Sequence, residues 1–260
     1  MECPRYILFA RQEGLAKLKL HRPEKLNALG PDLYDELETL LRECRDDPDI
    51  RVVLITGGPK VFGAGGDLEF ISKCDIPLAC KFSDQSQRVN ELLADLPKPT
   101  IAGIAGHALG GALELALCCD FRIAADNAVL GLPEINLGFI PGAGGTQRLP
   151  RLIGTTRSAD LLFLGETIDA VKAESWGIVN KVVPLAELES ECEKLARKLI
   201  SKSPIAFRAA KDSMRSGLNV GLKEGLKIEQ NLFCFLFGTL DQKEGVRAFM
   251  EKRKATFIGK

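Results

Sequence analysis

The sequence has few of the residues that bind metals or drive hydrolysis. It contains two histidines, His21 and His107, and no H-x-x-x-H or C-x-x-C pair, the spacings typical of zinc sites. No G-x-S-x-G motif occurs either, so a hydrolase with a Ser-His-Asp triad has weak support. We therefore expect no metal site and no serine-hydrolase chemistry.

Nucleotide-binding loops are also missing. The turn at 63–68, GAGGDL, has Leu68 where G-x-G-x-x-G requires its last glycine. No G-x-x-x-x-G-K sequence is present. Neither a dinucleotide site nor a P-loop is supported.

The sequence also lacks features that would direct the protein to a membrane, a secretory route or nucleic acid. No run of about 18 apolar residues suggests a membrane span, and residues 1–5 do not begin a signal peptide. Lys plus Arg and Asp plus Glu both number 35, so no global field favours nucleic acid or an anionic membrane. The eight cysteines lack the spacing of a disulfide framework. We expect a cytoplasmic protein, or a mitochondrial matrix protein whose transit segment has been removed.

What the chain does contain is a repeated order of strand, glycine turn and helix. Apolar residues make up 45% of the 260 residues, which allows a sizeable core. We expect strands at 6–10, 15–20, 51–57, 99–105, 121–124 and 128–130, glycine turns at 62–66, 106–111 and 142–145, and helices at 32–45, 78–96, 112–117 and 146–152. This order predicts an α/β core that extends to about Pro150.

Beyond Ile153 the pattern is mostly helical. We expect helices at 158–164, 170–176, 188–201, 205–216, 222–237 and 243–253, and a single strand at 179–183. The run 232–237, LFCFLF, is apolar on every helical face, so it needs neighbours on more than one side. A subunit interface and the core of the same chain are both candidates for these neighbours.

Two glycine turns, at 63–66 and 106–111, each follow a strand and open a helix. A helix N-terminus carries free N–H groups and a partial positive charge, and glycine lets a ligand approach the backbone closely. Two such N–H groups that converge on one point would form an oxyanion hole. Tight turning of the chain alone would also explain these glycines.

Two carboxylates, Glu114 and Glu134, stand alone in the apolar stretches 110–117 and 131–138. A buried, unpaired carboxylate is costly, so its pKa rises toward neutrality, as an acid–base catalyst requires. A solvated or helix-capping glutamate is the alternative interpretation of each one.

Together these residues resemble the crotonase superfamily, also called the enoyl-CoA hydratase/isomerase family. The likeness runs from about Leu20 to Phe257 and rests on four stretches, at 22–29, 62–68, 105–120 and 132–148. The last reads LPEINLGFIPGAGGTQR, which is highly specific for the family. The resemblance implies an α/β spiral of repeated ββα units at 1–195 and a helical C-terminal region at 196–260, which builds trimers that often pair into hexamers.

The resemblance also implies the chemistry. Gly66 and Gly111 would supply two N–H donors to a thioester oxygen, and Glu114 and Glu134 match the two catalytic glutamates of the hydratases. Glu114 would accept a proton from water as its oxygen adds to C3 of a 2-enoyl-CoA, and Glu134 would protonate C2, although these two roles are open to exchange. The product would be a 3-hydroxyacyl-CoA. No cofactor is implied, because coenzyme A is part of the substrate.

The expected binding site for the substrate and its coenzyme A portion is longer. It comprises Lys25, Leu26, Ala28, Ala64, Gly65, Gly66, Asp67, Leu68, Gly111, Gly142, Phe249 and Lys252. The N–H of Gly142, at the expected start of a helix, would help to place the water. Phe249 and Lys252 would reach the nucleotide phosphate of a neighbouring subunit, although the basic cluster 252–254 read alone is a solvated face.

The chain departs from the family pattern at two positions beside the expected site. Leu132 and Glu69 replace the Gln and Lys of close mitochondrial hydratases, so the substrate range cannot be copied across. An enoyl-CoA isomerase and a hydratase of branched, cyclic or aromatic acyl-CoA are the nearest alternatives. An RNA-binding relative would need a lysine-rich helix, whereas the helix at 33–45 is acidic. A catalytically silent scaffold is disfavoured by the two retained glutamates.

Overall fold

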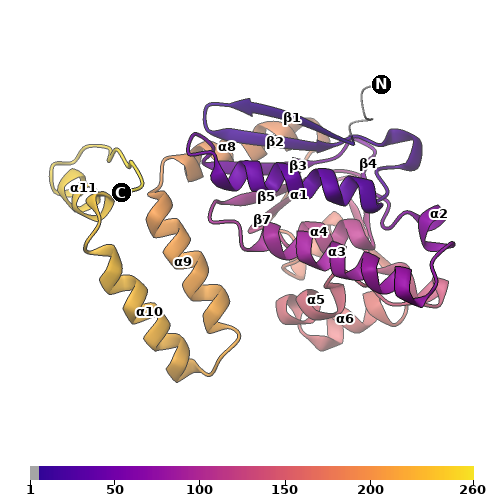
Figure 1. The fold of residues 1–260 in the computed structure, drawn as a ribbon. Coiled ribbons are helices and arrows are strands. Elements are labelled where there is room, and N and C mark those ends of the chain that lie inside the picture. Colours follow the sequence, from indigo (N-terminus) through magenta and orange to yellow (C-terminus); the bar gives the residue numbers. More distant parts are fainter. Residues whose placement is uncertain (1–5) are drawn as a thin grey trace.

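The computed structural model describes residues 6–260 and contains two sheets joined by helices (Figure 1). The larger sheet has the strand order β1-β2-β3-β5-β7-β10. Its strands are β1 (Ile7–Gln12), β2 (Leu15–Leu20), β3 (Val52–Thr56), β5 (Thr100–Ile104), β7 (Phe121–Ala125) and β10 (Lys181–Val183). Only β1 and β2 pair antiparallel in this sheet. They form the predicted hairpin.

The smaller sheet has the order β4-β6-β8-β9. Its strands are β4 (Val61–Gly63), β6 (His107–Leu109), β8 (Val129–Gly131) and β9 (Thr167–Asp169). The chain therefore alternates between the sheets, since β3 leads to β4, β5 to β6 and β7 to β8, and each pair of strands is followed by helix. This alternation confirms the predicted spiral of ββα units.

Eleven helices complete the described part of the chain. They are α1 (Pro31–Asp46), α2 (Leu68–Ile71), α3 (Ile76–Ala94), α4 (Gly111–Leu117), α5 (Gly145–Ile153), α6 (Thr155–Leu162), α7 (Ala170–Ser175), α8 (Leu188–Ile200), α9 (Pro204–Gly217), α10 (Leu222–Leu236) and α11 (Leu240–Met250), with short 3-10 helices η1 (Pro23–Lys25), η2 (Pro133–Leu137) and η3 (Leu185–Glu187). No helix among residues 6–260 has both the length and the apolar character needed to cross a membrane.

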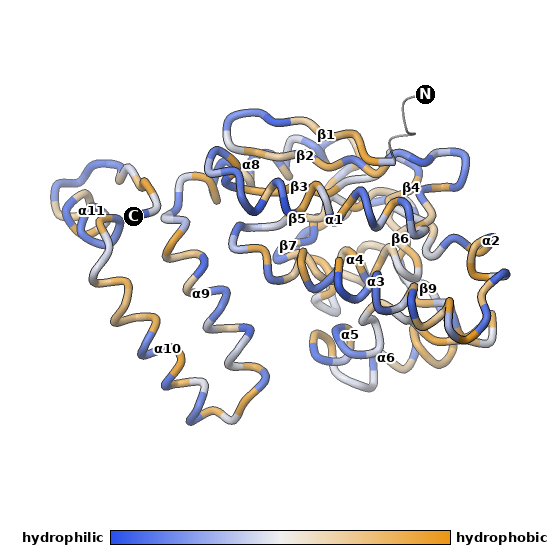
Figure 2. Tube along the Cα trace, viewed as in Figure 1, coloured by the Kyte–Doolittle hydropathy of each residue, from blue (hydrophilic) through white to orange (hydrophobic). Residues whose placement is uncertain are grey.

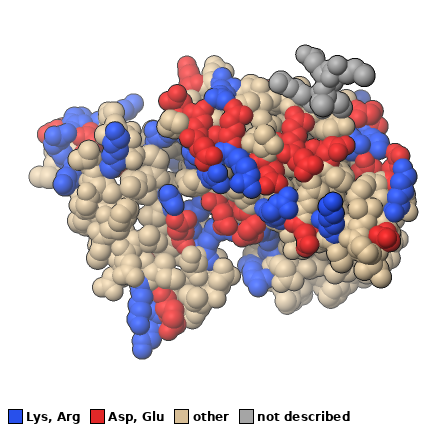
Figure 3. Space-filling model, viewed as in Figure 1, with Lys and Arg blue, Asp and Glu red and all other residues tan. Residues whose placement is uncertain are grey.

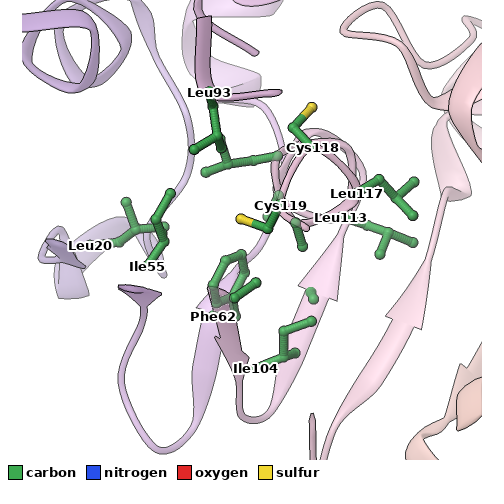
Figure 4. Packing of buried hydrophobic residues seen from close by; sticks show 14 of the residues in the cluster. Leu20, Ile55, Phe62, Leu93, Ile104, Leu113, Leu117, Cys118 and Cys119 are labelled. Carbon is green, nitrogen blue, oxygen red and sulfur yellow. The ribbon is translucent and has the colours of Figure 1, made fainter. Parts of the chain in front are cut away.

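The main core fills the space between the sheets, α1, α3 and α4. The fully buried Phe62 of β4 lies at its centre, and side chains from β2, β3, β5, α3 and α4 surround it (Figure 4). A second apolar cluster, which includes Val52, Ile101 and Ile123, lies on the other face of the larger sheet, where Leu188, Cys192 and Ala196 of α8 cover it. The larger sheet is thus covered on both faces, as parallel strands require.

Three sequence predictions are wrong in the same way. Strands β4 and β6 overlap the expected glycine turns at 62–66 and 106–111, and β9 lies between two expected helices where no element was expected. Each has three residues, too few to show an alternating pattern, although β8 and β10 are as short and were expected. The region beyond Ile153 therefore holds two strands rather than one. The α/β core also does not end near Pro150, since β10 pairs with β7 and α8 packs on the sheet.

The C-terminal helices α9, α10 and α11 extend away from the sheets as an arm (Figure 1). The implied boundary at 195/196 falls inside α8, and the division into two regions stays a prediction. Cys3 lies outside the described residues, whereas the other seven cysteines are free thiols.

The core of the same chain does not cover the apolar run on α10. Phe233 and Phe235 are each 60% exposed and Phe237 is 53% exposed. Hydrophobic positions recur along α10 (Figure 2), and few charged side chains cover the arm on the face shown in Figure 3. The core of the same chain therefore does not account for this run, and the subunit interface stays a prediction.

One buried ion pair fastens the arm to the sheet. Lys211 of α9 has a side chain that is 3% exposed, and its Nζ lies 2.9 Å from Oδ2 of Asp120, at the start of β7. The same oxygen accepts hydrogen bonds from the N–H and the hydroxyl of Thr100. Removal of Asp120 would leave the lysine charge buried without a partner.

We expect Asp120→Asn to lower the free energy of unfolding by about 3 to 5 kcal/mol, the usual cost of breaking a buried ion pair. Lys211→Met should cost less, because Asp120 keeps its bonds to Thr100 and is partly exposed. Urea denaturation followed by circular dichroism measures both changes. Equal costs for the two substitutions would contradict this account of the pair.

Candidate active site

A cavity of about 560 Å³ opens between α1, α3, α4, η2 and the loop before α5. Glu114, Glu134, Gly66 and Gly111 all line it. The structure therefore brings together, from three separate parts of the chain, the residues that the sequence singled out. Their chemical roles stay predictions.

Glu114 lies one turn from the start of α4, a helix in which every residue is buried. The carboxylate is 2% exposed, and its Oε1 accepts hydrogen bonds from the N–H of Ala143 at 2.8 Å and of Gly145 at 2.7 Å. These two donors come from the glycine-rich segment 142–145. They hold one oxygen and leave Oε2 without a protein partner within residues 6–260.

Glu134 follows Pro133 in η2 and is 8% exposed. Its Oε2 is buried and has no hydrogen-bond partner among the described residues. Its Oε1 lies 2.7 Å from the point that a Cβ on Gly110 would occupy. Gly110 also has φ of 50°, so both the backbone and the approach of this carboxyl require glycine there.

The two carboxyls differ in the groups that shift their pKa values. Burial raises the pKa of Glu114, while the N–H bonds from Gly145 and Ala143 and the charge of Arg148 oppose the rise. Burial raises the pKa of Glu134 to about 7, its own backbone N–H opposes the rise, and the negative charge of Glu114 adds to it. Donors from other residues thus favour the charged form only at Glu114.

The two candidate oxyanion donors are adjacent. Leu29 bonds to the residues on both sides of Gly66, since its N–H donates to Gly65 and its carbonyl accepts from Asp67. Within residues 6–260 neither the N–H of Gly66 nor that of Gly111, the first residue of α4, donates a hydrogen bond. A Cβ on Gly111 would lie 3.6 Å from the Gly66 nitrogen. Two unpaired N–H groups thus border one side of the cavity.

The residues expected to bind coenzyme A divide into three groups. Ala64, Gly65, Leu68 and Gly142 line the cavity together with Gly66 and Gly111. Lys25, Leu26, Ala28 and Asp67 do not line it, although the carbonyl of Leu26 accepts a bond from the N–H of Ala64, which does. Phe249 and Lys252 lie at the end of α11, in the arm and away from the cavity of their own chain (Figure 1).

Asp67 and Glu69 form ion pairs with the basic side chains around them. Asp67 is buried, caps α2 through the N–H groups of Glu69 and Phe70, and pairs with Arg22 at 2.8 Å. Glu69 is exposed and bridges Lys25 at 2.7 Å and Lys73 at 3.0 Å. The chain therefore already neutralises Lys25, the cation expected to meet coenzyme A.

One expectation about the loop needs correction. Helix α5 begins at Gly145, so Gly142 lies in the loop before the helix rather than at its start. The carbonyl of Gly142 accepts bonds from Ser83 and Gln87 of α3. The N–H groups that reach Glu114 belong to Ala143 and Gly145, and neither was singled out from the sequence.

Two further residues bear on the site. Leu132 is fully buried, and a Cβ on Gly145 would meet both its Cδ1 at 3.0 Å and Glu114 Oε1 at 3.1 Å. It therefore forms part of the apolar surroundings of Glu114. Tyr34 of α1 also lines the cavity. Its position could have been noted from the sequence, because a tyrosine within the apolar stripe of a helix has a hydroxyl that needs a polar partner.

The described residues do not favour a metal ion or a nucleic acid as the ligand. Residues 6–260 contain no cluster of three or more His, Cys, Asp or Glu placed to hold a metal ion. Acidic and basic side chains intermingle over α1 on the face shown in Figure 3. That mixed surface is unlike the basic stripe of a nucleic-acid-binding face.

Comparison with known proteins agrees with this site. Residues 10–260 match the family model described as "Enoyl-CoA hydratase/isomerase". "Crotonyl-CoA hydratase" of Syntrophomonas wolfei is 44% identical over 98% of both chains. "Short-chain-enoyl-CoA hydratase" of Clostridium acetobutylicum is 37% identical over 95% of both chains.

Solved structures agree as well. The crystal structure of an enoyl-CoA hydratase from Bacillus anthracis superimposes with a TM-score of 0.95 at 40% identity, over 98% of this chain and 100% of the other. The repeated ββα spiral, the sequence match over residues 10–260 and the near full-length relatives lead to one conclusion: the chain belongs to the enoyl-CoA hydratase/isomerase family.

Proposed function

We propose that the protein adds water across the 2,3 double bond of a 2-enoyl-CoA to give a 3-hydroxyacyl-CoA. One observation carries the proposal: two buried carboxyls and two unpaired glycine N–H groups border the same cavity. Relatives named as hydratases of crotonyl-CoA and of short-chain enoyl-CoA support the same reaction. The enzyme is thus a hydro-lyase.

The thioester carbonyl would lie between the N–H groups of Gly66 and Gly111. As oxygen adds to C3, negative charge moves through C2 to the carbonyl oxygen and produces an enolate. A fixed donor of this kind is worth about 2.7 to 4 kcal/mol of transition-state stabilisation. Because both donors are backbone groups in a closed site, they need no rearrangement during the reaction.

Glu114 and Glu134 would divide the proton transfers. Glu114, whose charged form the two N–H bonds favour, would hold the water through Oε2 and accept its proton as the C3–O bond forms. Glu134, with a pKa of about 7, would give its proton to C2 as the enolate collapses. The proton on Glu114 must then return to Glu134 before the next turnover, so the pair titrates as a unit.

The remaining parts of the proposal concern binding and assembly. Coenzyme A would lie along Lys25–Leu26, Ala28 and 64–68, and it enters as part of the substrate, so the reaction requires no resident cofactor or metal. The exposed phenylalanines of α10 would pack in a homotrimer or a dimer of trimers. Phe249 and Lys252 would then reach a neighbouring subunit's nucleotide. The free thiols favour a reducing compartment, either the cytoplasm or the mitochondrial matrix.

Replacement of either glutamate tests the assignment. We expect Glu114→Gln and Glu134→Gln each to lower kcat by about 10² to 10⁴-fold, the range for loss of a general acid or base. Binding of crotonyl-CoA should change little, because Gln keeps the shape. Loss of absorbance of the conjugated thioester measures turnover, and calorimetry measures binding. Turnover equal to that of the unmodified enzyme in either variant would reject the assignment.

The same assay separates the nearest alternative reaction. A hydratase removes the 2,3 double bond of crotonyl-CoA, whereas an isomerase would only move a double bond. Mass analysis should therefore find a product heavier by one water. A product of unchanged mass would favour the isomerase.

The pH dependence of kcat/KM should be bell-shaped. Because Glu134 must be protonated to donate, activity should fall as pH rises through its pKa of about 7. Because Glu114 must be charged to accept a proton, activity should also fall at acid pH. The residual activity of Glu134→Gln should lack the alkaline limb. An alkaline limb that persists with the same midpoint in this variant would refute the role of Glu134.

Glu69 offers a test of the coenzyme A path. Glu69→Gln frees Lys73 and leaves Lys25 paired with Asp67 alone, so we expect KM for crotonyl-CoA to fall by about 2- to 5-fold at low salt, the scale of an exposed ion pair. Crotonyl-pantetheine, which lacks the nucleotide phosphates, should show no change. Glu191→Gln is the matched control, because Glu191 bridges Lys181 and Lys194 outside the cavity. Equal effects on both thioesters would contradict phosphate binding by Lys25.

A further inference from the structure

The hydroxyl of Tyr34 is a polar group in the cavity to which the mechanism above gives no role. Tyr34 is 1% exposed and lines the cavity beside Gly111 and Glu114. Its hydroxyl has no hydrogen-bond partner within residues 6–260. Because Tyr34 lines the cavity, an acceptor there, either water or a bound ligand, can accept a hydrogen bond from this hydroxyl.

The ring of Tyr34 is held firmly by its neighbours. It lies on the buried stripe of α1 with Leu33, Leu37 and Leu41. The ring packs edge-on against Phe82 of α3, with ring centres 5.9 Å apart and planes at 69°. Phe82 in turn packs edge-on against Phe70 at 5.1 Å. The direction of the hydroxyl is therefore set by packing rather than by a polar partner.

The hydroxyl points to the space beside the two glycines. The point that a Cβ on Gly111 would occupy lies 3.8 Å from Tyr34 Oη and 3.6 Å from the Gly66 nitrogen. The absent side chain of Gly111 thus leaves room that the phenol and the Gly66 N–H both border. A carbonyl oxygen bound by the glycine N–H groups would lie within reach of this third group.

The phenol stays neutral in this setting. Burial raises the pKa of Tyr34 well above its usual value, and the nearby charge of Glu114 adds to the rise. Tyr34 therefore keeps its proton near neutral pH and acts as a hydrogen-bond donor. The other hydroxyls on this side of the cavity already have acceptors, since Ser83 donates to the Gly142 carbonyl and Ser86 to the Ser83 carbonyl.

We propose that the Tyr34 hydroxyl donates a third hydrogen bond to the thioester carbonyl oxygen, beside the N–H groups of Gly66 and Gly111. The assignment rests on the proposed hydration of an enoyl-CoA and deepens it. Two backbone donors and one side-chain donor would then share the charge of the enolate. The phenol proton stays on oxygen throughout, so no additional proton transfer enters the reaction.

Kinetics of Tyr34→Phe give the first test, because this change removes only the hydroxyl and keeps the ring against Phe82. We expect kcat on crotonyl-CoA to fall about 10- to 100-fold, below or at the lower end of the loss for a principal oxyanion donor. KM should change less than about 3-fold, and Tm should not fall. Tyr6→Phe is the matched control, since the chain has two tyrosines and Tyr6 lies outside the cavity. It should turn over normally.

Infrared spectroscopy of a bound, unreactive thioester gives the second test. Butyryl-CoA has no double bond to hydrate, and a ¹³C label isolates its carbonyl stretch. Hydrogen bonds lower that frequency, so the label should absorb at higher wavenumber in Tyr34→Phe than in the unmodified enzyme or Tyr6→Phe. An unchanged frequency overturns the proposal whether or not kcat falls, because Tyr34 would then act elsewhere, for example on Glu114.

The two proposals fail in different ways. If the unmodified enzyme does not hydrate crotonyl-CoA, the proposed function fails, whereas the carbonyl frequency still reports on Tyr34 wherever butyryl-CoA binds. If hydration is normal and the frequency does not respond to Tyr34→Phe, only the third donor is lost.

Discussion

The site depends on keeping Glu114 in an apolar interior. A carboxylate buried on α4 would be expelled or neutralised unless something compensated its charge. The compensation comes from two backbone N–H groups, those of Ala143 and Gly145, which reach one oxygen across the cavity. The glycine-rich loop before α5 therefore has an electrostatic function beyond turning the chain. Gly142 and Ala143 of this loop also line the cavity.

The same contacts make the two carboxyls unequal. Both are buried, and burial alone would raise both pKa values. Glu114 receives two external donors, whereas Glu134 has an oxygen with no partner and a pKa of about 7. Burial raises the pKa of both side chains, but only at Glu114 do N–H donors from other residues oppose the rise and favour the charged form. This difference favours one of the two role assignments that the sequence left open.

Sequence patterns predicted the parts of the fold that are long enough to be periodic. The amphipathic helix at 32–45 is α1, and the apolar run 51–57 contains β3. The three-residue strands β4, β6 and β9 were not predicted, because each pairs with a strand that is remote in sequence: β4 with β6, and β9 with β8. Their pairing is a tertiary property with no local signal.

The site shows the same limit. A lone glutamate in an apolar helix and glycines after strands are local features, so Glu114, Gly66 and Gly111 could be singled out from the sequence. The family resemblance was needed to join them to one another and to Glu134. The N–H donors of Ala143 and Gly145 could not be found, because any residue has an N–H. Tyr34 offered only the signal of a tyrosine in the apolar stripe of a helix, because the direction of its hydroxyl depends on packing. Only the coordinates of distant segments supply that information.

Ion pairs, in addition to the polypeptide chain, connect the arm to the active site. Lys211 of α9 pairs with Asp120 beside the larger sheet, and Arg215, one turn further on, pairs with Glu91 of α3. Glu91 also pairs with Arg148 of α5, the helix whose first residue, Gly145, donates to Glu114. The position of the arm is therefore linked through Glu91 to the loop that holds the buried carboxylate. Any contact that fixes the arm would therefore also restrain the helix that follows this loop.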